Sequence, residues 1–462
     1  MTGLVSSAPT PPGMRSISQR EGGQGNTRKA NPIDRIGIIA GGGSLPLEIA
    51  RSVAGRGGYV HVVMIEGEAD DALRTFPHEI LNWAELGRAA RSFKRAGIAD
   101  IIMVGRMSRP SFKTAKPDFG FLASLPQIMK ALRAGGDDAV LRGVVGLLES
   151  RRLRVLGVAD VAPELLISEG PLSFQRPGGA DEIDIAKGLA LVGALGPYDI
   201  GQAVIVTDGV VEAIEGAEGT DRMIARVRDK RLQGGLDLAR VRNGVLVKRP
   251  KPGQDTRLDL PAIGPDTVAA AAEAGLAGIA GMTGKVLAAS RFEMIARADR
   301  AGLFVAGVAG PEADTVLEDA YIDPIVFGNE SIPAAAGADV ARGVSAMSEL
   351  ARLSTGTALV IADGRVLAVG AEESAEDVLY RAAPFIRRKR RSAIVVLGPQ
   401  TALDAKLIEA AAHIRLQGVI LTFGAGDGPR HTGPILDIAD RLRLFVAGTP
   451  VLQPVSLSAG AL

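Results

Sequence analysis

Carboxylate side chains gather at loop positions in the middle of this chain. They are Glu212, Glu215, Glu218, Asp221, Asp255 and Asp259. Hard oxygen ligands on loops held by glycine and proline suit Mg²⁺, and also Mn²⁺. None of the four histidines lies in this region and the chain has no cysteine, so neither a zinc site nor thiolate chemistry is expected here.

The first group of acids belongs to the stretch "GQAVIVTDGVVEAIEGAEGTD". Gly216 and Gly219 allow a tight turn between an alternating apolar run and a helix. Structural interpretations also exist, because Glu212 fits a solvated strand face, Glu218 fits the surface and Asp221 fits a helix cap. The residues alone leave both interpretations open.

The second group lies in the loop "KPGQDTRLDLP". Asp255 and Asp259 flank Arg257, so the spacing is compatible with a metal site and with an ion pair. The basic run from Lys248 to Lys251 is either a solvated patch or a binding site for phosphate. A metal ion, neutralising cations and a carboxylate that removes a proton together favour phosphoryl chemistry.

A glycine-rich turn lies near the start of the chain, in "RIGIIAGGGSLPLEIA". The pattern predicts a strand, a turn at Gly41 to Gly43 and a helix, which lets the backbone approach a phosphate or a ligand ring. A turn without a ligand has the same pattern. The turn departs from G-x-G-x-x-G, and only Glu66 lies near the distance expected for a ribose-binding acid. A nicotinamide-dependent oxidoreductase is therefore an alternative that the sequence does not favour.

The elements around these loops predict an α/β protein. A length of 462 residues allows about three domains, and Val- and Ile-rich runs alternate with helix-periodic segments. The 53 basic and 52 acidic residues balance, so nucleic acid is not an expected partner. No run of 18 apolar residues occurs, so no membrane-spanning helix is expected. The apolar segment 119–135 fits either a core helix or a surface that meets lipid.

One stretch of the chain recurs. The segment that starts at Gly201 returns as "GTALVIADGRVLAVGAEESAE" from Gly356, and "DRAGLFVAG" from Asp299 returns as "DRLRLFVAG" from Asp440. Because both segments recur in the same order, the pattern indicates duplication of a whole domain.

The two copies differ in their acids. Leu367 and Gly370 occupy the positions of Glu212 and Glu215, and the loop that carries Asp259 has no clear counterpart. The second copy is therefore expected to bind no metal. We also expect that it takes the place of a partner subunit's domain.

Five motifs in combination resemble the LpxI-type UDP-2,3-diacylglucosamine pyrophosphatase family of lipid A biosynthesis. Between Ile36 and Val308 the chain carries, in order, "GIIAGGGSLPLEIA", "IIMVGRMSRPSF", "GDDAVLR", "DIGQAVIVTDGVVEAIEGAEGTDRMI" and "DTRLDLPAIG". The resemblance implies a Rossmann-like domain and a second α/β domain with the substrate between them, usually in a dimer. It also implies Mg²⁺-dependent cleavage of UDP-2,3-diacylglucosamine to UMP and lipid X at the inner face of the cytoplasmic membrane.

The resemblance implies roles for individual residues. The expected catalytic residues are Asp259, Asp255 and Glu215. The expected metal ligands are Glu212, Asp221, Asp255 and Asp259. The expected substrate-binding residues are Gly41, Gly42, Gly43, Ser44, Arg106, Arg109, Thr220, Lys248 and Arg257. The stretch "EGAEGTD" is longer than the family's "EGTD", so either Glu215 or Glu218 fills the acidic role.

These observations combine into one prediction. The predicted parts are a disordered tail at 1–33, a Rossmann-like domain at 34–170, a catalytic α/β domain at 171–310, a connector at 311–350 and a degenerate repeat of 200–308 at 351–462. The predicted protein is a Mg²⁺-dependent pyrophosphatase of a lipid-linked nucleotide sugar. It is expected in the cytoplasm, peripheral at the inner membrane, with a homodimer as one arrangement. A nicotinamide-dependent oxidoreductase and a non-catalytic nucleotide-sugar-binding paralogue are the alternatives.

Overall fold

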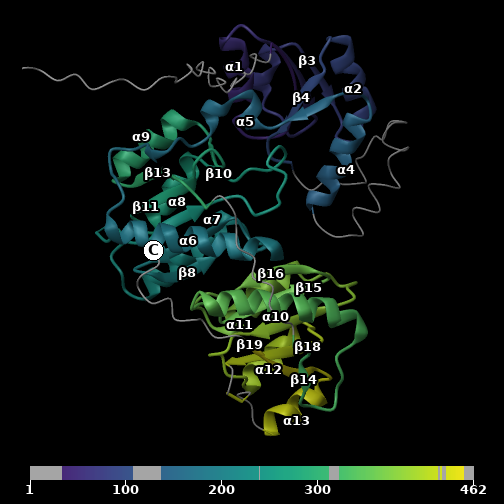
Figure 1. Ribbon diagram of the computed structural model, residues 1–462, viewed down its shortest axis with the longest axis vertical. Helices are drawn as coiled ribbons and strands as arrows, with labels where there is room; N and C mark the ends of the chain where they lie inside the picture. Colours follow the sequence, from purple (N-terminus) through teal and green to yellow (C-terminus); the bar gives the residue numbers. More distant parts are fainter. Residues whose placement is uncertain are drawn as a thin grey trace, which may run out of the picture. The chain divides into compact units, whose positions relative to one another are not determined.

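The computed structural model describes residues 34–107, 137–238, 240–311, 322–424, 427–428 and 433–451. The tail at 1–33, the apolar segment 119–135 and Arg109 lie outside these ranges. Within them the chain forms three sheets of five or six strands and a short two-stranded sheet, with helices packed against them (Figure 1). The α/β class predicted from the sequence is confirmed.

The first sheet is parallel throughout. Its strands are β1 (Arg35–Ala40), β2 (Tyr59–Ile65), β3 (His78–Leu81), β4 (Asp100–Val104) and β5 (Arg154–Leu156), in the order β3-β2-β1-β4-β5. Its helices are α1 (Leu45–Gly55), α2 (Leu86–Arg95), α4 (Asp137–Glu149) and the short α5 (Val158–Val161). The strand order reverses between β1 and β4, and ligands bind at such a switch point in open α/β sheets. The turns after β1 and β4 carry Gly41–Ser44 and Gly105–Arg106.

The second sheet is mixed. Its strands are β6 (Gly170–Pro171), β7 (Ala203–Thr207), β8 (Val210–Ile214), β9 (Val245–Lys248), β11 (Gly278–Met282) and β13 (Phe304–Val308), in the order β6-β13-β11-β9-β7-β8. Its helices are α6 (Gly179–Leu195), α7 (Thr220–Gln233), α8 (Pro265–Glu273) and α9 (Arg291–Ala301). The side chains of β7 alternate between two cores, with Val204 and Val206 on the α6 side and Ala203 and Ile205 on the side of the other three helices. The pair β10 (Ala262–Ile263) and β12 (Leu287–Ala288) forms the two-stranded sheet.

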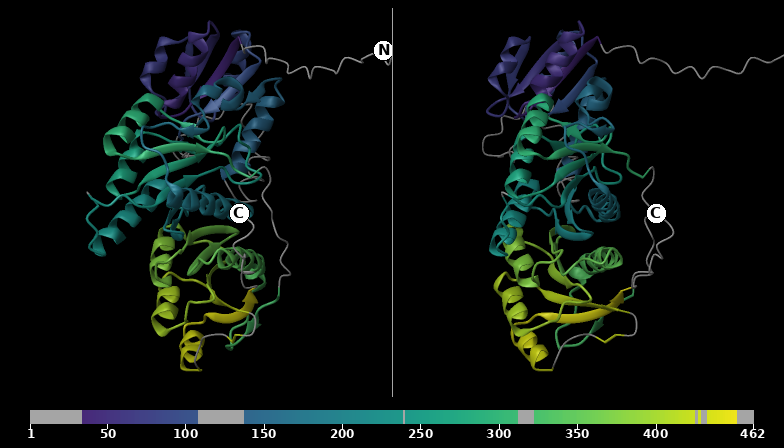
Figure 2. Two further views of the ribbon diagram at one scale, coloured as in Figure 1. Left: turned by 60° about the vertical axis from the view of Figure 1, so that its left-hand side comes forward. Right: turned by 90° about the vertical axis from the view of Figure 1, so that its left-hand side faces the viewer.

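The third sheet repeats this plan. Its strands are β14 (Ile325–Val326), β15 (Ala358–Ala362), β16 (Arg365–Val369), β17 (Ala393–Leu397), β18 (Gly418–Gly424) and β19 (Phe445–Val451), in the order β14-β19-β18-β17-β15-β16. Its helices are α10 (Gly337–Arg352), α11 (Ala375–Ala382), α12 (Ala405–His413) and α13 (Gly433–Arg441). In each of these two sheets a single long helix lies on one face and three helices lie on the other (Figure 2).

The second and third sheets also share the register in which their hairpin strands pair. The hairpin β7–β8 pairs Val204 with Ile214, and β15–β16 pairs Leu359 with Val369, each shifted by 155 residues. Both hairpins are irregular at the same place, between Ile205 and Val206 and between Val360 and Ile361.

A buried aspartate is also repeated. Asp184 of α6 accepts the backbone N–H of Gly209 (2.6 Å), and Asp339 of α10 accepts that of Gly364 (2.7 Å). The sequence prediction assigned α10 to the connector, whereas the structure packs α10 and β14 on the third sheet. These correspondences support the duplication that the sequence predicts.

Candidate active site

A cavity of about 610 Å³ brings together residues from the glycine-rich turn and from the acidic loops. Gly42, Gly43 and Ser44 line it from the turn after β1, and Gly105 and Arg106 line it from the turn after β4. Asp221, Arg257 and Asp259 line it from the second domain. The cavity therefore unites a site for anions with two of the predicted metal ligands.

The two turns of the first domain are held together by their backbones. Gly42 N–H donates to the carbonyl oxygen of Arg106 (2.7 Å), and Arg106 N–H donates to that of Gly42 (2.8 Å). A Cβ atom on Gly41 would lie 2.5 Å from the carbonyl oxygen of Arg106, so only glycine fits there. Gly41 itself does not line the cavity and acts by allowing this close approach. The Arg106 side chain stays exposed at the cavity.

Among the described helices longer than a single turn, four begin at the cavity, and the short α5 begins there as well at Val158. The lining residues at or beside their N-termini are Leu45 of α1, Asp221 of α7, Pro265 of α8 and Ser290 before α9. The first N–H groups of a helix have no partner within it, and the helix dipole places partial positive charge there. Converging helix N-termini therefore suit a ligand with several anionic oxygens, such as a diphosphate.

One contact ties α1 to the start of α9. Glu48 accepts the backbone N–H of Ser290 through both carboxylate oxygens (3.0 and 3.1 Å). The Ser290 and Ser44 hydroxyls lie 3.2 Å apart. The strand–turn–helix pattern gave no signal for this role of Glu48.

Asp259 is held by two amide side chains. Its Oδ2 accepts hydrogen bonds from Gln254 Nε2 (2.6 Å) and from Gln202 Nε2 (3.3 Å). No donor among the described residues contacts its Oδ1. One oxygen of this carboxylate is thus held by amides, and the other has no donor within the described part of the chain.

Lys248 lies buried behind the acids and does not line the cavity. Its side chain is 7% exposed, and its Nζ donates to Thr220 Oγ1 (3.0 Å) and to the Ala262 carbonyl oxygen (3.1 Å). Burial lowers the pKa of this ammonium group, while the charges of Glu215, Asp221 and Asp259 act in the opposite direction. The lysine therefore places a basic nitrogen of lowered pKa among three carboxylates.

Glu215 is joined to the same group. Its Oε1 accepts from Thr220 Oγ1 (2.8 Å), and its Oε2 accepts from the backbone N–H of Gln202 (2.8 Å). It lines a second cavity of about 220 Å³ that also contains Gln202 and, from β16, Arg365. Glu215 thus does not contact Asp259 directly. It binds the backbone of Gln202, whose side chain holds Asp259.

Asp255 and Arg257 form the ion pair that the sequence left open. Arg257 Nε and Nη2 donate to the two oxygens of Asp255 (2.9 and 2.7 Å), and Arg257 Nη1 donates to Glu149 (3.2 Å). The Arg257 guanidinium lowers the pKa of Asp255, and Asp255 in turn raises the pKa of Arg257. Only Arg257 of this pair lines the large cavity.

The structure separates Glu212 from the other predicted metal ligands. Its carboxylate binds Arg231 Nη2 (2.6 Å) and Thr207 Oγ1 (2.9 Å), and it does not line the cavity. The alternative interpretation, a solvated strand position for Glu212, is also wrong, because both side chains of the ion pair are nearly buried. Glu218 likewise turns away, into an ion-pair network with Arg226 and Arg381. Of the two acids left open in "EGAEGTD", Glu215 is the one joined to the site.

The carboxylates that line the cavity are the candidate ligands for a metal ion. Within the described ranges, no three Asp, Glu or His side chains cluster closely enough to enclose one. Asp221 and Asp259 nevertheless share the cavity, and Mg²⁺ is commonly bound by one or two carboxylates together with water and substrate phosphate. The residues therefore fit a Mg²⁺ ion that the substrate helps to hold.

Besides Glu48, three residues at the site escaped the sequence analysis. Gln202 and Gln254 hold Asp259, and Ser290 begins α9 with a left-handed backbone (φ 46°). Gln202 and Gln254 lie within the stretches that the sequence analysis singled out. A neutral amide side chain does not indicate a function by its type alone, so these two residues were recognised only from their contacts with Asp259.

Comparison with known proteins covers the same region. Residues 35–165 match the LpxI N-terminal domain, and residues 168–306 match the LpxI C-terminal domain. The chain is 39% identical over 276 residues to a Caulobacter vibrioides protein named UDP-2,3-diacylglucosamine pyrophosphatase LpxI. That alignment spans 59% of this chain and 97% of the Caulobacter protein. The chain belongs to the LpxI family.

Proposed function

We propose that this protein hydrolyses the diphosphate of UDP-2,3-diacylglucosamine and releases UMP and 2,3-diacylglucosamine 1-phosphate. The observation that supports this most is the shared cavity, in which Asp221 and Asp259 face the glycine-rich turn, Arg106 and four helix N-termini. The name of the Caulobacter relative supports the same substrate.

The diphosphate is the group that this cavity suits. Arg106 and Arg257 supply positive charge, and the N–H groups at the helix N-termini supply hydrogen-bond donors. The Gly42–Arg106 backbone pairing fixes the distance between the two turns before substrate arrives, so little ordering is needed on binding.

Asp259 is our candidate for the group that receives a proton from the attacking water. Gln202 and Gln254 hold its Oδ2, and among the described residues no donor binds Oδ1, which leaves that oxygen available to accept a proton. Lys248 lies next to Asp259, Asp221 and Glu215, and the charges of these carboxylates favour its protonated form against the effect of burial. Glu215 and Thr220 position Lys248 and Gln202.

Mg²⁺ is our proposed cofactor, held by Asp221 and Asp259. When bound, such an ion polarises a phosphoryl oxygen and offsets the negative charge that builds up on it. The ion pair of Asp255 with Arg257 keeps Arg257 at the cavity.

The substrate carries two acyl chains, so we propose that the enzyme works at the cytoplasmic surface of the inner membrane. Within the described residues, no helix has both the length and the apolar character needed to cross a bilayer. Contact with the membrane would then be peripheral.

The test is release of UMP from UDP-2,3-diacylglucosamine by the purified full-length chain, with Mg²⁺ and with EDTA. We expect release with Mg²⁺ only, and a large loss in Asp259→Asn. Asp229→Asn is the matched control, because Asp229 is an exposed carboxylate on α7 that does not line the cavity. No UMP from the wild type would overturn the proposal and would favour a nucleotide-sugar-binding paralogue. Equal release of UMP in EDTA would contradict the proposed metal requirement but not the proposed substrate.

A further inference from the structure

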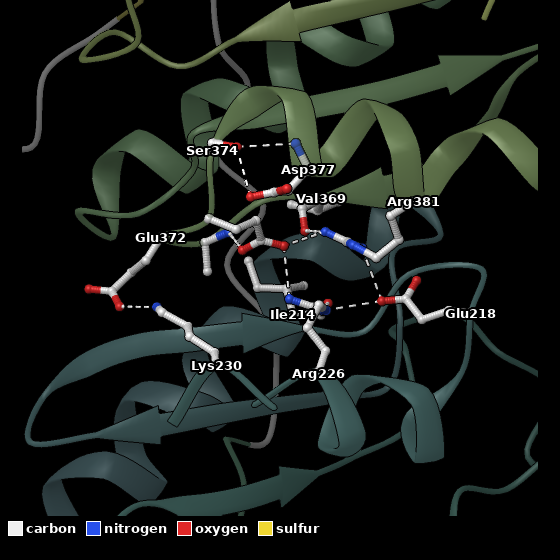
Figure 3. A network of polar contacts seen from close by, with 11 residues as sticks. Ile214, Glu218, Arg226, Lys230, Val369, Glu372, Ser374, Asp377 and Arg381 are labelled. Atoms are coloured by element: carbon white, nitrogen blue, oxygen red, sulfur yellow. Dashed lines mark hydrogen bonds and ion pairs between the residues drawn. The ribbon is translucent and has the colours of Figure 1, made fainter. Parts of the chain in front are cut away.

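The contact between the second and third domains has an internal symmetry. Arg226 lies on α7 and Arg381 lies on α11, 155 residues apart, and Glu218 and Glu373 precede these helices with the same separation. Each arginine binds the glutamate of its own domain and the glutamate of the other domain (Figure 3). The four residues are named the Arg–Glu quartet below.

The two cross-domain pairs of the quartet are equivalent to one another. Arg226 Nη1 donates to Glu373 Oε1 (2.8 Å), and Arg381 Nη1 donates to Glu218 Oε1 (3.0 Å). Arg226 Nη2 also donates to the Ile214 carbonyl oxygen (3.2 Å), and Arg381 Nη2 to that of Val369 (2.8 Å), again 155 residues on. Arg226 thus contacts the residue 155 places after Glu218, and Glu218 contacts the residue 155 places after Arg226. This reciprocal pairing is the rule of a two-fold interface.

The apolar part of the contact follows the same rule. Helices α6 and α10 occupy matching places on their sheets, and their inner side chains belong to one continuous core. That core takes Val204 and Val206 from β7 and the matching Leu359 and Ile361 from β15. The quartet is also largely buried, since the exposed fraction of its side chains runs from 4% at Glu218 to 23% at Arg226. A patch this apolar and this well paired is typical of a permanent interface.

We infer that the third domain occupies, within one chain, the place of a second copy of the second domain. The covered face of the second domain is then self-complementary, because Glu218 and Arg226 of one copy would pair with Arg226 and Glu218 of another. In this protein the Arg381 and Glu373 of its own chain fill that position. The face is therefore closed to a second copy of the chain.

One side-chain ion pair across the contact has no symmetric equivalent and provides a direct test. Lys230 Nζ lies 3.0 Å from Glu372, and both side chains are about half exposed. The positions 155 residues from these two are Phe385 and Ala217, so no equivalent pair exists. A carbodiimide joins an ammonium and a carboxylate in contact, forming an amide bond as the carbodiimide takes up the water. Arginine does not react in this way, so the quartet stays intact.

The first experiment treats the wild-type full-length chain with a water-soluble carbodiimide. The products are separated on a denaturing gel, and the Lys230–Glu372 peptide is identified by mass spectrometry. We expect the link in the monomer band of 47.8 kDa. Glu372→Gln is the control that removes it. A link found in a dimer band, or no link above the control, overturns the inference.

The second experiment exploits the self-complementary charges. The double variant Glu373→Arg/Arg381→Glu places like charges opposite each other inside the chain, while each domain face still complements its own kind. We expect this variant to lose the Lys230–Glu372 link and to form concentration-dependent dimers in light scattering.

Adding Glu218→Arg and Arg226→Glu restores opposite charges within the chain. The fourfold variant is expected to be monomeric through this face and to regain the link. A fourfold variant that behaves like the double variant, with both folded by circular dichroism, overturns the inference.

Discussion

Glu212 and Arg231 form an ion pair of 2.6 Å in the second domain, and both positions are apolar in the third. The residues 155 places later are Leu367 and Ile386, which pack against one core. Acid and base are therefore both absent from the third domain. The resemblance implied that Glu212 is a metal ligand, and its absence from the second copy fitted that role. The absence of its partner as well gives a simpler explanation. The pair belongs to the folding of the domain.

This pair leads to a prediction about stability. Glu212→Ala leaves Arg231 buried without its carboxylate, and breaking a buried pair costs about 3–5 kcal/mol. The double variant Glu212→Leu/Arg231→Ile adopts the residues of the third domain and is expected to lose clearly less than Glu212→Ala. Unfolding in urea measures both. An equal loss in the two variants, or a reduced Mg²⁺ affinity in the double variant, would speak for a role in chemistry.

A second prediction concerns Asp259 and the amides that hold it. If Asp259 accepts the proton of the attacking water, Asp259→Asn lowers kcat by about 10²- to 10⁴-fold. Gln254→Ala frees one side of the carboxylate and is expected to lower kcat by about 10- to 150-fold with little change in KM, because a hydrogen bond to a charged group is worth roughly 1.5–3 kcal/mol. Steady-state UMP release measures both. Gln233→Ala, at the end of α7, is the control.

A third prediction concerns the alkaline pH dependence. Burial lowers the pKa of Lys248 below its ordinary value of 10.5, so the site loses this charge at a lower pH than an exposed lysine would. We expect kcat/KM to fall at alkaline pH as Lys248 deprotonates. The variant Lys248→Met is expected to have low activity at every pH and to lack this alkaline fall in kcat/KM. The sign for stability is opposite. A lowered pKa in the folded state makes stability rise with pH between the folded pKa and 10.5. Thermal unfolding at several pH values tests that rise.

A fourth prediction concerns Asp255 at acid pH. Arg257 lowers the pKa of Asp255 below its ordinary value of 3.8. The stabilisation from this carboxylate is therefore complete above about that value and is lost as the pH falls through the lower, folded pKa. In Arg257→Gln the loss is expected at higher pH. Carbon-13 NMR of the Asp255 carboxylate follows the change directly, and Asp255→Asn identifies the signal. An unshifted titration in Arg257→Gln would contradict the prediction.

Local patterns in the sequence were sufficient for the fold class and for part of the site. The parallel first sheet and the glycine-rich turn follow from β-branched runs next to glycines, and the β7–β8 hairpin follows from Asp208-Gly209 between two alternating runs. The cavity also contains Asp221 and Asp259, which the motifs singled out. These features depend on neighbours in the chain, so the chain order reveals them.

The rest depended on contacts between distant residues. Gln202 meets Asp259 across 57 positions, and Arg226 meets Glu373 across 147. Helix α10 was assigned to a connector, although Asp339, Ala341 and Gly343 repeat Asp184, Ala186 and Gly188 of α6 at the same shift of 155 residues. This part of the repeat is short, and its meaning became clear only from the structure, in which Asp339 repeats the turn contact of Asp184.

Gly370 shows why the third domain has no acid at this position. It stands where Glu215 stands in the second domain, and a Cβ atom there would lie 2.2 Å from Thr357 Oγ1 and 2.6 Å from Val378 Cγ2. A carboxylate could therefore stand at this position only if the Thr357 and Val378 side chains moved or changed. The neighbours of Gly370 fill the space that a side chain needs, so Gly370→Glu alone would overcrowd this position and would not recreate the acid of the second domain.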